Sequence, residues 1–450
     1  MRLRSALAAL ICAACSQAGV NAPDAAARLD AAQEPDAGPR PDARPPDAGQ
    51  PDAADPPPRY TEDRVHSPIT DSVVNAIATI VARDPDLHAD IFSKIGDSIT
   101  VAPQFVTCFA GSAADLDSFA DEIGSTVEHF KGGRVAGVTP YERVSDAASV
   151  GKSADWALAG SPSPLMKEID TAQPRYAVVM FGSNDVASRT IHLFGTSMLD
   201  IVDQLAAAGV VPILSTIPPN DQNATVSALV PRFNAVVRGI AQARQVPLVD
   251  LNREMLALPE HGLGSDNLHP NAFSGGACKL TPEGLMFGYN TRNLLTMQAL
   301  DRARSVVEGE PPPDLPDGPP AVIGAGSYTS PFLIGSLPFT DLHDTSQSPN
   351  TTITAYPGCN ATQNESGPEY VYKLTIADGI KVRALVIVPE GVDVDVHLMS
   401  GLTGADCVAR HDRELTATLT AGTHYFVLDT FVPAQAPASG EYLFVLLDDG

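Results

Sequence analysis

Short apolar runs alternate with stretches of helical periodicity between residues 60 and 308. The apolar positions of segment 198–205 recur with the spacing of one helix face, and Gly209 follows them as a stop signal. A second stripe of this kind occupies 229–240. Strands separated by amphipathic helices predict a parallel sheet covered on both faces, a three-layer α/β/α architecture. The strands are expected at residues 91–95, 176–181, 210–215 and 246–251.

A different pattern begins after residue 320. Short runs rich in β-branched and aromatic residues are separated by turn signals such as Asp378-Gly379 and Glu390-Gly391, and no helical stripe intervenes. This spacing predicts a small all-β sandwich over residues 323–450. Its strands are expected at 370–376, 382–388, 392–398, 415–419, 424–429 and 442–447.

Two segments lack the apolar residues that a core requires. Residues 15–59 contain repeated Pro-Asp-Ala units, and residues 309–322 are again rich in proline, aspartate and glycine. Such segments cannot bury enough apolar surface to fold, and proline keeps them extended at about 3.1 Å per residue. We therefore expect a disordered tether at 15–59, a first domain at 60–308, a linker at 309–322 and the sandwich at 323–450.

The first residues are typical of an export signal. A basic start precedes an apolar run that is too short to span a bilayer. The run ends in Cys-Ala-Ala-Cys at 12–15, which resembles a bacterial lipobox, although that pattern usually has leucine in place of Cys12. The motif predicts a lipoprotein-type signal peptide at 1–14 with lipidation of Cys15; the alternative is ordinary cleavage after Ala18. The protein is thus expected to be exported, as a lipoprotein of the outer membrane or cell surface or as a secreted protein, with no membrane contact beyond the lipid anchor.

The net charge limits the binding partners that are expected, and the cysteines predict disulfide bonds. The formal net charge is −25 at pH 7, and a surface that repels phosphates excludes nucleic acid as a partner. Four cysteines lie outside the signal region, and pairing is expected in an oxidising compartment. Four cysteines can pair in three ways, and the pairing that keeps each bond within one predicted domain is favoured. The spacings between the cysteines are not those of a zinc site. The favoured pairs are Cys108–Cys278 and Cys359–Cys407.

Two polar motifs follow predicted strands of the parallel sheet. Gly-Asp-Ser at 96–98 comes directly after the first strand, where Ser98 would project from a tight turn and the next helix would direct N–H groups at a developing negative charge. Gly-Ser-Asn-Asp at 182–185 follows the second strand, where Asn184 could donate from its side-chain amide. The alternatives are a helix cap for the first motif and an Asx turn for the second.

A third motif, Asp-Asn-Leu-His at 266–269, follows the last strand by a loop. A catalytic serine needs a neutral imidazole to accept its proton and an acid to orient that imidazole. A spacing of three residues lets one turn present Asp266 and His269 together. Taken alone, this motif is common by chance and is more typical of a capped loop histidine. His261 is an alternative base, but no carboxylate lies three residues before it.

In this order, the three motifs resemble the GDSL/SGNH hydrolase family over residues of about 60 to 305. Phe-Asn-Ala at 233–235 and Leu-Thr-Pro-Glu-Gly at 280–284 add to the resemblance. It implies a flavodoxin-like fold, with Ser98 as nucleophile, His269 as general base and then acid, and Asp266 as the orienting carboxylate. The implied oxyanion hole consists of the Ser98 N–H, the Gly151 N–H and the Asn184 amide. The match is loosest at Gly151, because the family's asparagine-containing glycine motif is missing there, and Gly132, Gly133 and Gly137 are rivals.

The C-terminal part resembles bacterial pre-peptidase C-terminal domains, through Tyr-Val-Tyr-Lys-Leu at 370–374, the alternating run 392–398 and Ala-Gly-Thr-His-Tyr at 421–425. In that family the domain is accessory. Asp393 and Asp395 could bind calcium from one strand face, and a solvated face is the alternative.

The resemblance implies a serine esterase that hydrolyses carboxylic esters outside the cytoplasm without metal or organic cofactor. The expected substrate is an ester, either an acylated polysaccharide or a lipid. The alternatives are a lipase or lysophospholipase of the same type and a catalytically inactive surface binding lipoprotein. The sequence contains no Gly-x-Ser-x-Gly elbow and no His-Glu-x-x-His motif.

Overall fold

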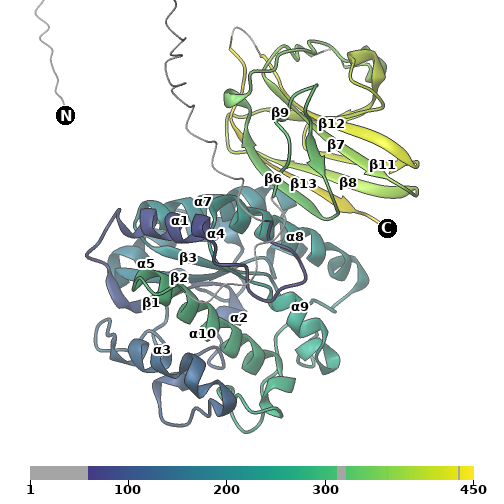
Figure 1. Cartoon of the computed structure of the whole chain (residues 1–450). Coiled ribbons are helices and arrows are strands. Elements are labelled where there is room, and N and C mark those ends of the chain that lie inside the picture. Colours follow the sequence, from purple (N-terminus) through teal and green to yellow (C-terminus); the bar gives the residue numbers. More distant parts are fainter. Residues whose placement is uncertain (1–58, 312–320, 362, 434–435) are drawn as a thin grey trace, which may run out of the picture. The chain divides into compact units, whose positions relative to one another are not determined.

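The computed structural model describes residues 59–311, 321–361, 363–433 and 436–450 (Figure 1). The signal peptide expected at 1–14, the tether up to residue 58, Cys15 and residues 312–320 of the linker lie outside the described residues. In the part of the chain that the structure describes, no helix combines the length and apolarity needed to cross a membrane.

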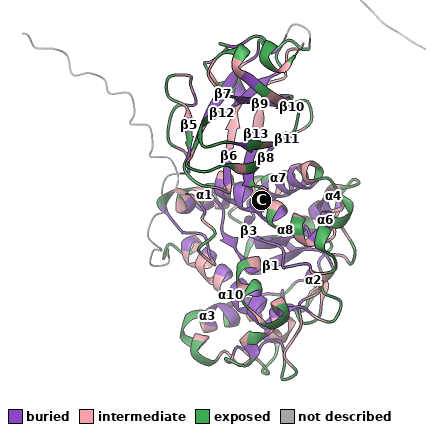
Figure 2. Cartoon of the chain, turned by 90° about the vertical axis from the view of Figure 1, so that its right-hand side faces the viewer, coloured by how far each residue is buried: buried purple, intermediate pink, exposed green. Residues whose placement is uncertain are grey.

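Four parallel strands form the sheet of the first domain, in the order β1-β2-β3-β4. The predicted parallel sheet is therefore confirmed. Three of the strands are buried along their whole length, and the remaining one, which comes first in the chain, is buried from Ile91 onward (Figure 2). The last strand is shorter than expected because the Asp250 side chain accepts the Arg253 N–H and so begins a helix at Leu251. The strands are β1 (His88–Gly96), β2 (Pro174–Met180), β3 (Val211–Ser215) and β4 (Leu248–Val249).

Helices α7 and α8 cover one face of the sheet, and α3 and α10 cover the other (Figures 1 and 2). In α7 the buried stripe includes Met198, Ile201 and Leu205, as the periodicity predicts, and the Thr190 hydroxyl caps its first turn. The helices are α1 (Asp71–Val81), α2 (Ser98–Val101), α3 (Ala120–Gly132), α4 (Ala154–Leu158), α5 (Pro164–Ala172), α6 (Asp185–Ser188), α7 (Ile191–Ala207), α8 (Ala224–Arg244), α9 (Leu251–Leu256) and α10 (Gly288–Val307).

The outer edge of β1 meets a loop in place of a continuous strand. Gly96 forms a single parallel bridge with Ala148: its N–H donates to the Ala147 carbonyl, and its carbonyl accepts the Ser149 N–H. These two hydrogen bonds hold the loop 145–152 against the end of β1, immediately before Ser98.

Residues 332–448 form two facing sheets, which confirms the predicted β-sandwich. One sheet has the order β10-β9-β12-β7-β5 and the other β11-β8-β13-β6. Every pairing is antiparallel except that of β5 with β7. The strands are β5 (Phe332–Ile334), β6 (Phe339–Asp344), β7 (Glu369–Ile376), β8 (Ile380–Ile387), β9 (Val394–Met399), β10 (Cys407–His411), β11 (Glu414–Leu419), β12 (Gly422–Thr430) and β13 (Glu441–Asp448).

Both favoured disulfide pairs are confirmed. Cys108 bonds to Cys278 and Cys359 bonds to Cys407. The first bond joins the segment that follows Ser98 to the segment that follows His269. A crosslink that closes so long a loop contributes about 2–4 kcal/mol, mainly by restricting the unfolded chain.

Candidate active site

Ser98 is the first residue of α2, and only Asp97 separates it from the end of β1. The side chain of Asp97 caps this helix by accepting the Ile99 N–H at 3.0 Å, which fixes the turn. The turn also requires glycine before it, because a Cβ at Gly96 would lie 2.4 Å from the Met180 carbonyl oxygen. Ser98 remains partly exposed beside these buried neighbours. The strand-to-helix turn therefore presents its hydroxyl at the carboxyl end of β1, where open α/β sheets bind ligands.

The loop 266–269 places an imidazole and a carboxylate next to this hydroxyl. Ser98 Oγ lies 2.8 Å from His269 Nε2, and His269 Nδ1 lies 2.6 Å from Asp266 Oδ2. Asp266 Oδ1 accepts the N–H groups of Leu268 and His269 at 3.1 and 3.0 Å, and Asn267 has a positive φ of 57°. The three residues, predicted from two motifs far apart in the sequence, thus form one hydrogen-bonded chain.

Hydrogen bonding also sets the charge of Asp266. Partial burial raises the pKa of its carboxyl, but the hydrogen bond with the His269 side chain and the two backbone N–H groups outweigh that effect, and the net pKa is lowered. An ionised carboxylate at Oδ2 accepts the proton on Nδ1 and leaves Nε2 free to accept a proton from Ser98.

Asn184 reaches the same turn from the end of β2. Its Nδ2 donates to Asp97 Oδ2 at 3.2 Å and to the Lys152 carbonyl at 3.1 Å. Gly182 turns the chain before it with a φ of +129°. The Lys152 contact brings the loop of Gly151 beside Asn184, and Gly151 itself is exposed with a φ of +70°.

The rival glycines lie elsewhere. A Cβ at Gly133 would meet the carbonyl of Asp90, near the start of β1 and away from Ser98 at its other end. Gly132 is the last residue of α3 beside it, and Gly137 belongs to the tight turn closed by Val135 and Val138. Among the candidate glycines, Gly151 is the one whose loop contacts the arrangement.

His261 has a carboxylate partner that the local sequence does not reveal. Its Nδ1 lies 2.7 Å from Asp221 Oδ2, from the loop that follows β3. The Asp221 N–H donates to the Asn267 carbonyl, so this second histidine–aspartate pair adjoins the loop of the first. His269 is the histidine bonded to Ser98.

Arg292 stabilises the turn that carries Ser98 by hydrogen bonds from α10, a role that the sequence motifs did not indicate. It is buried in α10, donates to the Ile99 carbonyl at 2.7 Å and to Thr100 Oγ1 at 3.1 Å, and lies over the Phe105 ring. Burial lowers the pKa of its guanidinium to about 10. The sequence signal that could have indicated this role is a charged residue within a helix that is otherwise buried, because such a residue needs partners in the interior.

Asp97 is buried beneath Ser98, and burial raises the pKa of its carboxyl to about 6. The Ile99 N–H, Arg292, His269 and the Asn184 amide act in the opposite direction without cancelling this effect. Between an unfolded pKa near 4 and the folded value, the folded state holds a proton that the unfolded chain has lost. Asp97 therefore stabilises the fold at low pH, and that contribution is lost as the pH rises through about 6.

We expect Asp97→Asn to remove this pH dependence. About two pKa units correspond to roughly 3 kcal/mol at most. Part of this gain is lost because the new amide faces the Asn184 amide, donor to donor. At pH 8 the free energy of unfolding of the variant should therefore exceed that of wild type by about 1–2 kcal/mol. Urea unfolding of both proteins at pH 4 to 8 measures the difference. Parallel stability profiles would show that Asp97 does not titrate in this range.

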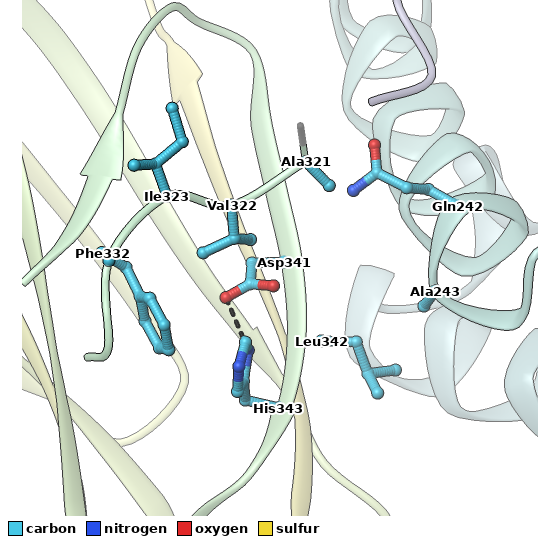
Figure 3. Close-up of a pocket in the computed structure, with 10 residues that line it drawn as sticks. Gln242, Ala243, Ala321, Val322, Ile323, Phe332, Asp341, Leu342 and His343 are labelled. Carbon is cyan, nitrogen blue, oxygen red and sulfur yellow. Dashed lines mark hydrogen bonds and ion pairs between the residues drawn. The ribbon is translucent and has the colours of Figure 1, made fainter. Parts of the chain in front are cut away.

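A cavity of about 710 Å³ lies between α8 and the segment 321–343 (Figure 3). Its wall is largely apolar, with Val322, Ile323 and Phe332 beside an Asp341–His343 hydrogen bond of 2.8 Å. Neither Ser98 nor His269 is among its described lining residues. The cavity is therefore separate from the candidate site.

Comparison with known proteins finds a family match within the first domain. Residues 94–273 match the sequence model of the GDSL-like Lipase/Acylhydrolase family. No curated protein matches the chain. Among solved structures, a GDSL-like lipase from Bacteroides thetaiotaomicron is 15% identical, with 51% of this chain and 99% of that chain covered and a TM-score of 0.31.

Two other solved structures are similar to parts of the chain. A catalytic mutant of an acetylxylan esterase from Geobacillus stearothermophilus is 13% identical over 46% of this chain and 93% of that chain, with a TM-score of 0.33. The pre-peptidase C-terminal domain of a collagenase from Bacillus anthracis is 14% identical over 25% of this chain and 91% of that chain, with a TM-score of 0.18. On the family match, residues 94–273 form a GDSL-like lipase/acylhydrolase domain, and the protein is a hydrolase of ester bonds.

Proposed function

We propose that the protein is an extracytoplasmic serine esterase that works through an acyl-enzyme formed on Ser98. The observation that carries the proposal is the continuous chain of hydrogen bonds from Ser98 Oγ through the His269 ring to Asp266. A serine hydroxyl is a weak nucleophile by itself, and a base at 2.8 Å that is oriented by a carboxylate is the arrangement that activates it.

The proposed reaction has two halves. Ser98 Oγ attacks the ester carbonyl carbon while its proton moves to His269 Nε2. The ester C–O bond then breaks, and the leaving alcohol takes that proton. A water attacks the acyl-enzyme, gives a proton to His269 and releases the carboxylic acid, after which Ser98 regains its proton.

The negative charge of the tetrahedral intermediate needs donors that are already in place. We infer that the N–H groups of Ser98 and Gly151 and the Asn184 amide supply them. Both Nδ2 hydrogens of Asn184 have acceptors in the structure, so a bound oxyanion would compete with the Lys152 carbonyl for one of them. The bond to Asp97 would meanwhile hold the amide in position.

Asn184→Ala is therefore expected to lower kcat about 10²–10³-fold with a smaller change in KM. Steady-state hydrolysis of p-nitrophenyl acetate measures both constants. Asn252→Ala is the matched control, because that amide donates to the Ile217 carbonyl at 3.1 Å. A change in KM alone would contradict an oxyanion role for Asn184.

The substrate class that we propose is an acylated polysaccharide. An accessory β-sandwich joined to the esterase domain fits a polymeric substrate better than a small free ester. Initial rates on p-nitrophenyl esters of increasing acyl length, alongside acetylated xylan and chitin fragments, test this choice. A preference for long acyl chains with no release of acetate from either polymer would favour a lipase instead.

Export and lipidation of Cys15 complete the proposal. The basic start, the small residues before Cys15 and two disulfides support it, because disulfides persist in oxidising compartments. The mass of the N-terminal peptide of the mature protein is the test. A peptide that starts at Met1, or one that begins after Ala18, would contradict lipidation at Cys15.

A further inference from the structure

His397 is buried in the β-sandwich with no hydrogen-bond partner on either ring nitrogen. It is 0% exposed, its ring stacks on Tyr356 at 3.7 Å, and both Nδ1 and Nε2 are unpaired. A neutral imidazole has one N–H donor and one acceptor nitrogen, and leaving both unpaired in a dry interior is costly. Alternation along β9 explains the burial, because Val396 and Leu398 face the core between the sheets and His397 faces the opposite, covered side.

The same side of the sheet carries a buried acid cluster, consisting of Glu365, Glu369, Asp395 and Asp429. Asp429 on β12 lies directly opposite both Asp395 on β9 and Glu369 on β7 in the strand register. Their exposures are 0% for Glu369 and Asp429 and 3% for Asp395, and Glu365 from the loop before β7 is also 0% exposed. Carboxylates placed opposite one another repel.

The Arg410 guanidinium faces this cluster. Arg410 forms an ion pair with Asp395 and lies 3.9 Å from Glu365. Asp395 is thus paired with Arg410, whereas Asp393 is exposed to solvent. The calcium pair considered from the sequence is not the arrangement that the structure presents, and the solvated-face alternative is wrong for Asp395.

Some polar atoms of the acid cluster accept no hydrogen bond from the rest of the chain. Asp429 accepts the Tyr356 hydroxyl and the Thr430 N–H. Glu369 accepts two backbone N–H groups through Oε1, and its side chain also interacts with Tyr328 and Asp429. Glu365 accepts no hydrogen bond from a backbone N–H or a basic side chain, and its carboxyl group interacts with that of Asp395. The atoms left without a hydrogen-bond partner outside the cluster thus include carboxylate oxygens and an imidazole nitrogen of the same buried region.

We propose that Glu365, His397 and Asp429 bind a divalent transition-metal ion of the Zn²⁺ type. One ligand atom from each of the three lies within 4.8 Å of the others. A cation there neutralises the surplus carboxylate charge and gives the imidazole a partner. One nitrogen with two carboxylates is a ligand set that suits Zn²⁺, whereas Ca²⁺ takes oxygen ligands.

The nearby sulfurs are not part of this site. Cys359 and Cys407 also approach His397, but they are bonded to each other and carry no thiolate to bind a metal. The site is therefore expected to bind metal while the disulfide is intact. It lies in the β-sandwich and is independent of the esterase proposal.

The test uses the full-length protein with its disulfides formed, freed of metal with EDTA, mixed with ZnCl₂ and passed through a desalting column. We expect the protein to retain one zinc per chain by plasma mass spectrometry and to gain several degrees in Tm. His397→Gln and Glu365→Gln should each weaken zinc binding about tenfold or more, since even changes outside the ligand shell have effects of that size. His424→Gln is the matched control, because that ring, near the start of β12, contacts the Thr420 carbonyl.

The Glu365→Gln variant also distinguishes a loss of metal binding from a folding defect. It removes a buried charge without changing shape, so its metal-free form should melt no lower than metal-free wild type. Wild type that retains no zinc would overturn the proposal, and so would both glutamine variants retaining zinc as wild type does. A Tm gain with CaCl₂ alone, equal in wild type and His397→Gln, would also overturn it, because such a site would use only oxygen.

Discussion

Ser98→Ala is expected to lower kcat for p-nitrophenyl acetate by about 10⁶-fold, down to the background rate. The substitution removes the atom that lies 2.8 Å from His269 Nε2 and would form the acyl-enzyme. It leaves the Asp97 cap and the Arg292 contacts in place, because these bind backbone and Thr100 atoms. The fold should therefore persist, and an unchanged Tm verifies this.

Ser183→Ala is the matched control for that experiment. Ser183 is 7% exposed, precedes Asn184, and its hydroxyl has no hydrogen-bond partner. Its loss should change kcat only slightly, although it disturbs a segment next to the site. Full activity in Ser98→Ala would show that another residue carries the acyl group or that hydrolysis needs no such intermediate.

Asp266→Asn is expected to lower kcat about 10⁴-fold. An asparagine amide can donate to His269 Nδ1, which favours the tautomer whose proton sits on Nε2. That nitrogen then faces Ser98 as a donor and cannot accept the hydroxyl proton. The asparagine Oδ1 can still accept the N–H groups of Leu268 and His269, so the loop should keep its shape.

The second histidine–aspartate pair supplies the control for this variant. Asp221→Asn alters the same kind of contact, 2.7 Å to His261 Nδ1, in the adjoining loop. It should reduce kcat by less than tenfold if His269 is the base, since His261 is then a neighbour and not a proton acceptor. The reverse order of effects would transfer the role of base to His261.

The parallel sheet and the three motifs could be predicted because their signals are local. The apolar runs of β2 and β3 are buried along their whole length, so they read as strands without knowledge of the fold. Ser98 and Asn184 lie just after the ends of β1 and β2, Asp266 comes after β4 and α9, and parallel strands end at one edge of a sheet. The topology therefore brings the motifs together from positions far apart in the chain.

Contacts made by distant segments could not be predicted in this way. β5 and β6 were missed because their runs are short and include polar residues such as Asp341, whose buried oxygen accepts the Tyr372 hydroxyl. The carboxylate partner of His261 is forty positions away in sequence. His397 lies in a run that reads as an ordinary strand, and its burial depends on the loop that places Tyr356 over it.

The bond between Cys108 and Cys278 changes what a protease could do to this enzyme. Ser98 lies before the first of these cysteines, and His269 lies between them. A single backbone cut anywhere from residue 109 to residue 268 would divide the polypeptide into one fragment that carries the hydroxyl and another that carries the imidazole. The sulfur link keeps the two fragments in one molecule, so nicking the surface loops of this region does not by itself allow the reacting groups to diffuse apart.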